Sequence, residues 1–171
     1  MKVLKFIFFG LLSLIVLAAV AAIFMKKDFH YEKSTDINAS KDLVWSYVSN
    51  FSKHDSWSQW KLLDPNMKTE ISGVEGTVGS KMTWVSDHAQ VGNGSQTISN
   101  IIPGERIDVQ LEFDGDRNST SYYKFAGDST KCKVTWGLDM HIDYPMNVMG
   151  PIMDAMMDDM FVKGLNMLKD A

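Results

Sequence analysis

Four histidines are the side chains of this sequence that could serve as general bases or metal ligands near neutral pH: His30, His54, His88 and His141. Either role needs further ionisable or coordinating side chains at suitable spacing, and none of the four has them nearby in sequence. His141 alternates with Met140 and Ile142, so we expect it on the solvent side of a strand, beside Asp139. We therefore predict four surface histidines and no metal site.

Acid–base catalysis without a cofactor would use carboxyl, phenol and guanidinium groups that reach an apolar cavity, because enolisation and dehydration move only protons. The side chains that we consider for this role are Asp55, Asp64, Arg106, Tyr122 and Tyr123. Their spacing singles out no pair, and strand alternation sends several of them outward. The catalytic residues therefore stay unknown, and an enzyme is the less favoured interpretation.

Two further motifs bear on cofactors. The segment GVEGTVG places Gly73, Gly76 and Gly79 at intervals that resemble a phosphate-binding loop, but such a loop lies between a strand and a helix. Strands follow this segment, so we predict a turn. Cys132 is the single cysteine, which excludes an intramolecular disulfide and a zinc site of several cysteines. We expect no cofactor.

Large apolar side chains are the other candidates for function, because tryptophan and the flexible methionine thioether both suit the walls of binding cavities. Trp57 and Trp60 lie in DSWSQWKLLDPNM, where Pro65 stops helix propagation. Three residues apart on one turn, they should share a face and form a packed corner. Core packing would account for such residues equally well. The candidate ligand-binding residues are Trp57, Trp60, Met82, Trp84, Leu111, Phe113, Trp136, Met149, Met153, Met156 and Met160.

Alternation of apolar and polar residues predicts the strands that would carry these side chains. The first should run from Phe29 to Ile37, and others should lie around 81–85, 107–114 and 132–142. Turn-rich segments such as VGNGS and DGDRN separate them, which indicates an antiparallel meander. A short amphipathic helix capped by Asn38 or Ser40 should end near Asn50.

The helical period returns at Met146 and continues to the C-terminus. The dry face of the sheet is the large apolar surface available to this helix, so the sheet should curve around it in an α+β fold. One stripe of the helix combines Met149, Ile152, Met153, Met156, Met160, Gly164 and Met167.

An uncharged run from Phe6 to Met25 has the roughly 20 residues that a helix needs to cross a membrane. Lys2 and Lys5, followed by this run and by small residues at 19–21, also resemble a cleavable secretory signal. We favour an uncleaved anchor because the run exceeds the roughly 7–15 residues of a signal core. The predicted division is residues 1–27 as anchor and flanks and 28–171 as one domain. Lys2 and Lys5 before the run are matched by Lys26 and Lys27 after it, and the N-terminal amino group tips the positive-inside balance. The expectation is a single pass with the domain on the extracytoplasmic side.

Charge limits the partners of this domain. Four of the 17 basic side chains lie in residues 1–27 and all 21 acidic ones lie in residues 28–171, leaving a formal charge of −8 on residues 28–171. Such a domain should repel nucleic acid and anionic lipid. We expect no nucleic-acid partner, and the sequence does not decide the oligomeric state.

The order of motifs resembles the START-like helix-grip (SRPBCC) superfamily, in particular the membrane-anchored bacterial polyketide cyclase/dehydratase-like proteins. The motifs that carry the resemblance are INASKDLVWSYVSNF, WSQWKLLDPNM, GTVGSKMTW, VGNGSQTI, KCKVTWGLDM and YPMNVMGPIMD…FVKGLNMLK. The resemblance implies a cavity between a curved sheet and a long C-terminal helix that accepts lipids, polyketides or other apolar molecules. Only some members are enzymes.

Three functions therefore compete. The leading prediction is binding of an apolar small molecule or lipid at the cell envelope. The second is a cofactor-free polyketide cyclase, dehydratase or isomerase, which would place two ionisable groups face to face in the cavity. The third is a structural or partner-binding domain, which would carry its largest apolar patch on the outside.

Overall fold

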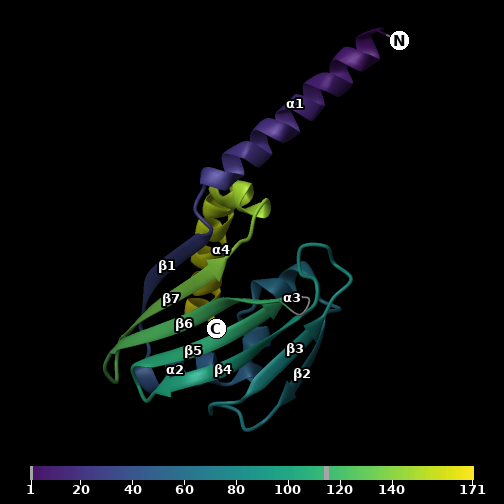
Figure 1. Ribbon diagram of the computed structural model, residues 1–171. Helices are drawn as coiled ribbons and strands as arrows, with labels where there is room; N and C mark the ends of the chain where they lie inside the picture. The colour runs from purple at the N-terminus through teal and green to yellow at the C-terminus, as the bar shows by residue number, and fades with distance from the viewer. Residues whose placement is uncertain (1, 114–115) are drawn as a thin grey trace.

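The computed structural model describes residues 2–113 and 116–171 and shows one curved antiparallel sheet with a long helix across its concave face (Figure 1). The strand order is β1-β7-β6-β5-β4-β3-β2. The strands are β1 (Asp28–Ile37), β2 (Lys68–Ser72), β3 (Lys81–Val85), β4 (Gly94–Ile102), β5 (Arg106–Phe113), β6 (Asp116–Gly127) and β7 (Cys132–His141). The helices are α1 (Lys2–Phe24), α2 (Lys41–Ser49), η1 (Phe51–Ser56), α3 (Gln59–Leu63), η2 (Met146–Met149) and α4 (Gly150–Asp170). This is the predicted α+β helix-grip fold.

The predicted alternation of buried and exposed residues is confirmed in strands that have one apolar and one polar face. In β7, Cys132 and Val134 are fully buried whereas Lys133 between them is exposed. The longest strand, β6, was not predicted, because its inner face begins with Ser119 and Ser121 and shows no apolar alternation there. The predicted turn DGDRN falls partly on residues outside the described ranges.

The connection from β1 to β2 follows local capping rules. The Ser40 side chain accepts a hydrogen bond from the Leu43 backbone nitrogen, which confirms a predicted cap. Helix α2 ends at Ser49, with Asn50 as its C-cap. The expectation that Trp57 and Trp60 share one helical turn is wrong. Trp57 closes the 3₁₀ helix η1, and Ser58 caps a new helix, α3, that contains Trp60.

The GVEGTVG segment is a turn between β2 and β3, as predicted. Gly73, Gly76 and Gly79 all have positive φ, at 81°, 74° and 90°. A side chain would strain that backbone, so these glycines serve the turn.

Helix α4 lies on the sheet, but it is rotated from the predicted stripe. Phe161, Leu165 and Leu168 are buried at its sheet-facing side. Met149 and Met156 are exposed instead, because the first half of α4 packs on the edge strand β1 and leaves its other side uncovered. The prediction that the whole methionine stripe faces the sheet is therefore wrong for its first half.

Helix α1 projects from the domain, as the upper part of Figure 1 shows, and almost all of its described side chains are exposed. Residues Lys5–Phe24 are long and apolar enough to cross a membrane or to serve as a signal sequence. The end of α1 is attached to the domain, since Ala22 is fully buried and its carbonyl accepts a 2.7 Å hydrogen bond from Asn147 Nδ2.

Close packing on the outer face of the sheet gives a first prediction. The Tyr122 ring lies flat over Gly137, where an added Cβ would come within 2.1 Å of the ring. Gly137→Ala should lower the free energy of unfolding by about 1–3 kcal/mol, as overpacking does, measured by urea denaturation. In a Tyr122→Ser background the same substitution should cost much less. An equal cost in both backgrounds would contradict this explanation.

Candidate functional site

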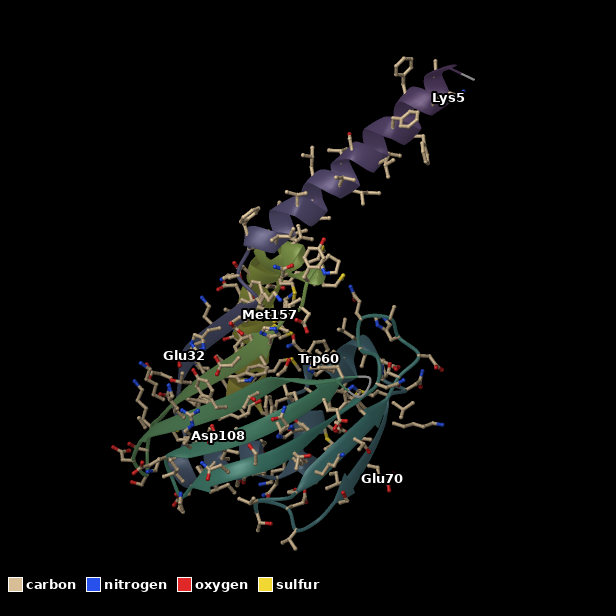
Figure 2. All side chains as sticks on the ribbon, viewed as in Figure 1. Lys5, Glu32, Trp60, Glu70, Asp108 and Met157 are labelled. Atoms are coloured by element: carbon tan, nitrogen blue, oxygen red, sulfur yellow. The ribbon has the colours of Figure 1, made fainter. Side chains whose placement is uncertain are left out.

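A cavity of about 270 Å³ lies between the sheet and α4, close to the lower end of the roughly 300–1,000 Å³ typical of ligand pockets. Figure 2 shows two of its lining side chains, Trp60 and Met157, on the side of the sheet that carries the helices. The lining residues are His54, Trp57, Ser58, Gln59, Trp60, Met67, Met82, Trp84, Gln90, Val91, Gln96, Leu111, Phe113, Ser119, Ser121, Tyr123, Trp136, Leu138, Met140, Met157, Met160, Phe161 and Gly164.

Most of the predicted ligand-binding residues meet at this cavity. The lining includes Trp57, Trp60, Met82, Trp84, Leu111, Phe113, Trp136 and Met160. The structure does not bring Met149, Met153 and Met156 to it. Met149 and Met156 are turned toward solvent, whereas Met153 is half-buried one turn before Met157. Met157 reaches the cavity in their place.

The central wall is a stack of three aromatic rings. Trp136 lies between Tyr123, at 5.6 Å between ring centroids, and Phe161 of α4, at 4.4 Å. Gly164 allows this approach, because a Cβ there would be 2.6 Å from the Trp136 ring. The Trp136 indole nitrogen donates a 2.9 Å hydrogen bond to the Ser121 hydroxyl, so the polar edge of the ring is satisfied within the wall.

His54 is buried, so its prediction as a surface residue is wrong. It lies in η1, and its ring is held by Val48 and Gln96. Nε2 donates to the Val48 carbonyl at 2.9 Å, which leaves Nδ1 to accept from the Gln96 side-chain amide at 3.2 Å. Burial lowers its pKa to about 4, so the ring is neutral at pH 7. No pattern in the sequence distinguished His54 from the exposed histidines.

The other histidines lie toward solvent. His30 and His88 are exposed, as predicted. His141 also lies on the outer face, two residues along β7 from Asp139 as predicted, and it bonds Asp28 at 2.7 Å. Hydrogen bonding to Asp28 raises the pKa of His141.

Trp57 and Trp60 play different parts at the cavity. Trp57 is buried, contacts the Tyr123 and Trp136 rings edge-on, and donates its indole N–H to the Tyr47 carbonyl at 3.3 Å. Trp60 is only half-buried. Trp57 is therefore core and wall together, whereas Trp60 lies at the rim.

Only one of the acid–base candidates lines the cavity. Tyr123 is buried there, and burial raises the pKa of its hydroxyl, so the phenol is neutral at pH 7. Asp55 is exposed, and Asp64 lies outside the lining, where it accepts a 2.5 Å hydrogen bond from the Ser86 hydroxyl.

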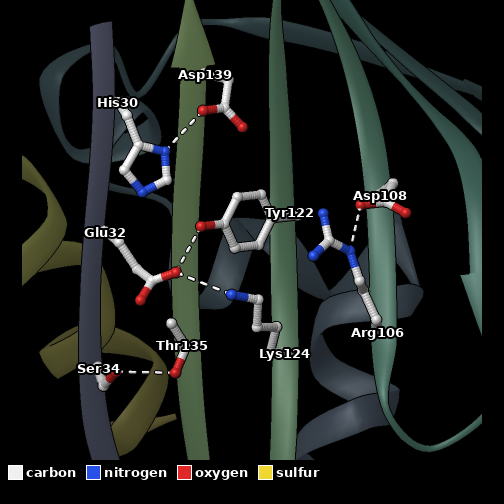
Figure 3. Close-up of polar contacts among 9 residues, drawn as sticks. All are labelled: His30, Glu32, Ser34, Arg106, Asp108, Tyr122, Lys124, Thr135 and Asp139. Atoms are coloured by element: carbon white, nitrogen blue, oxygen red, sulfur yellow. Dashed lines mark hydrogen bonds and ion pairs between the residues drawn. The ribbon is translucent and has the colours of Figure 1, made fainter.

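The other two candidates belong to a polar network on the outer face of the sheet, drawn in Figure 3. The Tyr122 hydroxyl donates to Glu32 Oε2 at 2.5 Å, and Lys124 Nζ reaches the same oxygen at 3.0 Å. Arg106 lies 4.3 Å from the centroid of the Tyr122 ring and bonds Asp108 at 2.7 Å. These groups partner one another, on the opposite side of the sheet from the cavity.

The cavity contains few groups that could take part in acid–base chemistry. His54 and Tyr123 are the only titratable side chains among its described lining residues, and both are neutral at pH 7. One polar atom is unpaired, since the Gln59 side-chain nitrogen is buried without a hydrogen-bond partner. The site offers apolar contact and, at Gln59, a buried donor whose hydrogen bond is not made within the protein. Sequence reasoning missed Gln59, because it lies in a loop-like stretch beside the more prominent tryptophans.

Fold and cavity together define a helix-grip protein of the START-like superfamily. The chain belongs to the family described as polyketide cyclase / dehydrase and lipid transport, whose model matches residues 28–171. No curated protein matches the chain in sequence.

Solved structures with low sequence identity share the fold. The Aha1 dimer from Colwellia psychrerythraea is 15% identical with a TM-score of 0.60, over 84% of this chain and 95% of that one. Norcoclaurine synthase from Thalictrum flavum, in complex with dopamine and hydroxybenzaldehyde, is 12% identical with a TM-score of 0.57, over 88% of this chain and 89% of that one. A protein from Chromobacterium violaceum is 16% identical with a TM-score of 0.58, over 83% and 96%.

The buried neutral His54 gives a second prediction. Its folded pKa of about 4 lies below the unfolded value of 6.5, so the unfolded state binds the proton first as the pH falls. Stability is therefore full above pH 6.5 and is lost between pH 6.5 and 4. From pH 7.5 to 5, the wild type should lose about 2 kcal/mol more than His54→Gln, measured by urea denaturation.

His88→Gln, which replaces an exposed histidine, is the matched control and should keep the wild-type dependence on pH. Identical losses in the wild type and in His54→Gln would show that His54 does not resist protonation.

Proposed function

We propose that this protein binds one small apolar molecule, or part of a lipid chain, in the cavity between the sheet and α4. Residues 28–171 form the binding domain, and residues 1–27 hold it at the cell envelope as an uncleaved, single-pass anchor with the domain on the extracytoplasmic side. The observation that carries the proposal is the aromatic and methionine-rich lining around an unfilled volume of about 270 Å³.

Burial of apolar surface is the driving force that such a lining supplies, at about 25 cal/mol per Å² of ligand surface removed from water. The walls are ordered by their own contacts, as in the stack of Tyr123, Trp136 and Phe161. A ligand therefore enters a largely preformed site and spends little free energy on ordering it.

The free donor of Gln59 sharpens the expected ligand. A buried amide N–H without a partner costs free energy, which a ligand oxygen at that position would recover. The ligand that fits best is apolar over most of its length and carries one hydrogen-bond acceptor, such as a carbonyl or carboxylate oxygen.

A cofactor-free cyclase, dehydratase or isomerase is the alternative, and the observation in its favour is that His54 and Tyr123 both line the cavity with displaced pKa values. The surroundings of His54 and Tyr123 nevertheless favour binding over acid–base catalysis. The Trp57 ring contacts both rings, at 4.7 Å from His54 and 6.4 Å from Tyr123. Both nitrogens of His54 are already hydrogen-bonded, so its proton is not available to a substrate.

The third prediction tests the cavity itself. Four of the five tryptophans line it, so tryptophan emission of the full chain in lipid nanodiscs should be quenched when a brominated fatty acid binds. Ser119→Phe, on the inner face of β6, should fill the space and abolish the quenching. Thr120→Phe, the next residue on the outer face, should leave it unchanged.

Lipid extraction of membrane-purified protein should give a co-purifying apolar molecule, which Ser119→Phe loses. No quenching and no co-purifying molecule in the wild type would overturn the proposal, and so would equal quenching in the two phenylalanine variants.

The fourth prediction tests the donor at Gln59. The probes are 2-acetylnaphthalene and 2-ethylnaphthalene, which share their shape but differ in one acceptor oxygen. Gln59→Leu should bind 2-acetylnaphthalene about fivefold more weakly, the loss of about 1 kcal/mol from one hydrogen bond. Its affinity for 2-ethylnaphthalene should not change. Equal effects on both probes, read from tryptophan fluorescence titrations, would remove Gln59 from ligand recognition.

A further inference from the structure

The first half of α4 exposes an apolar face that the cavity does not use. Met149, Ile152 and Met156 are 39%, 55% and 58% exposed, and their spacing of three and four residues puts them on one side of the helix. Tyr144 and Met146, just before the helix, are also exposed, at 46% and 62%. We call these five residues the outer methionine face.

The opposite side of the helix holds α4 on the edge of the sheet, so the outer methionine face points away from the domain. Asp158 forms a 2.5 Å ion pair with Lys33 of β1. The Phe29 ring of β1 packs against Gly150, where an added Cβ would lie 2.3 Å from it. Because these contacts fix the rotation of α4, the apolar face cannot turn inward.

The outer methionine face is continuous with the end of α1. Asn147, between Met146 and Met149, is fully buried and donates from Nδ2 to the carbonyl oxygens of Ala22 and Met25, at 2.7 and 3.2 Å. Figure 1 shows the start of α4 next to the point where α1 leaves the domain. The residues that would lie at the membrane boundary thus adjoin the exposed side chains.

We propose that the outer methionine face lies in the interfacial layer of the lipid bilayer that α1 spans. The inference rests on the membrane anchor proposed above, but not on the ligand of the cavity. From Met149 to Met156 the helix rises about 10 Å, comparable to the roughly 5–8 Å of each interfacial layer. Tyr144 suits this layer because its ring is apolar and its hydroxyl polar.

The charges around this face agree with contact to neutral lipid. The Asp154 and Asp158 carboxylates lie on other sides of α4 by helical spacing, and Asp158 is paired with Lys33. Asp159 follows one turn after Met156 on the same side, where Lys163 neutralises it in an ion pair. Met160, one turn beyond Met156, lines the cavity. Bilayer contact would therefore place the cavity next to the lipid from which apolar ligands come.

The experiment uses the full chain in nanodiscs of zwitterionic lipid, with an environment-sensitive fluorophore on single introduced cysteines and doxyl-labelled lipid as quencher. The test positions are Met146→Cys, Ile152→Cys and Met156→Cys. Val162→Cys is the matched control, since Val162 is 43% exposed on a different side of the same helix. Leu14→Cys in α1 reports on the anchor, and Cys132 is fully buried, which keeps it from labelling.

We expect blue-shifted emission and quenching by doxyl lipid at the three test positions and at Leu14→Cys, with neither at Val162→Cys. Quenching at Leu14→Cys but not at the test positions would overturn the inference and leave the anchor intact. Loss of quenching at Leu14→Cys as well would overturn both. Neither result depends on whether the cavity binds a ligand.

Discussion

The contact between Trp136 and helix α4 is the interaction on which the cavity depends. Gly164 lets the helix approach the ring, and Phe161 stacks on it at 4.4 Å between centroids. On one side of this contact, Leu165 and Leu168 close the space against the sheet as ordinary core. On the other side, Met157 and Met160 and the small inner residues of β6 leave it open. Interiors normally pack without voids, so an open region beside a dense one supports the proposal that a ligand fills it.

The fold was predictable because its signals are local. Alternation gave β1, β5 and β7, the Ser40 cap gave the start of α2, and the helical period gave α4. Strand β6 was not predicted, since serines on its inner face interrupt the alternation of apolar and polar residues that a buried strand face normally shows. Those serines exist because part of the face lines a cavity instead of a core. The serines of β6 that break the apolar alternation are thus the same residues that line the cavity.

The types of residue that line the site were predictable from the sequence, but the direction in which individual side chains point was not. A periodic stripe of methionines identifies a face of α4, but the angle of that face to the sheet is set by tertiary contacts such as Phe29 with Gly150 and Lys33 with Asp158. The resulting rotation turned Met149 and Met156 toward solvent, and Met153 lies on the inner side one turn before the cavity lining. His54 was missed for a similar reason: its burial follows from distant partners, Val48 and Gln96, rather than from neighbours in sequence.

The methionines at the cavity and those on the outer methionine face share one physical property. Thioether side chains lose little when their surroundings change between protein, ligand and lipid, because they are flexible and polarizable. In the proposed arrangement, the methionines of α4 lie against lipid on its outer side in the first half and against a ligand on its inner side in the second. Polar groups instead make their hydrogen bonds inside the protein: Asn147 Nδ2 donates to Ala22, the Trp136 indole nitrogen to Ser121, and His54 Nε2 to Val48. Internal hydrogen bonds therefore fix the positions of the helices and strands, and the remaining apolar surfaces are the ones proposed to contact ligand and lipid.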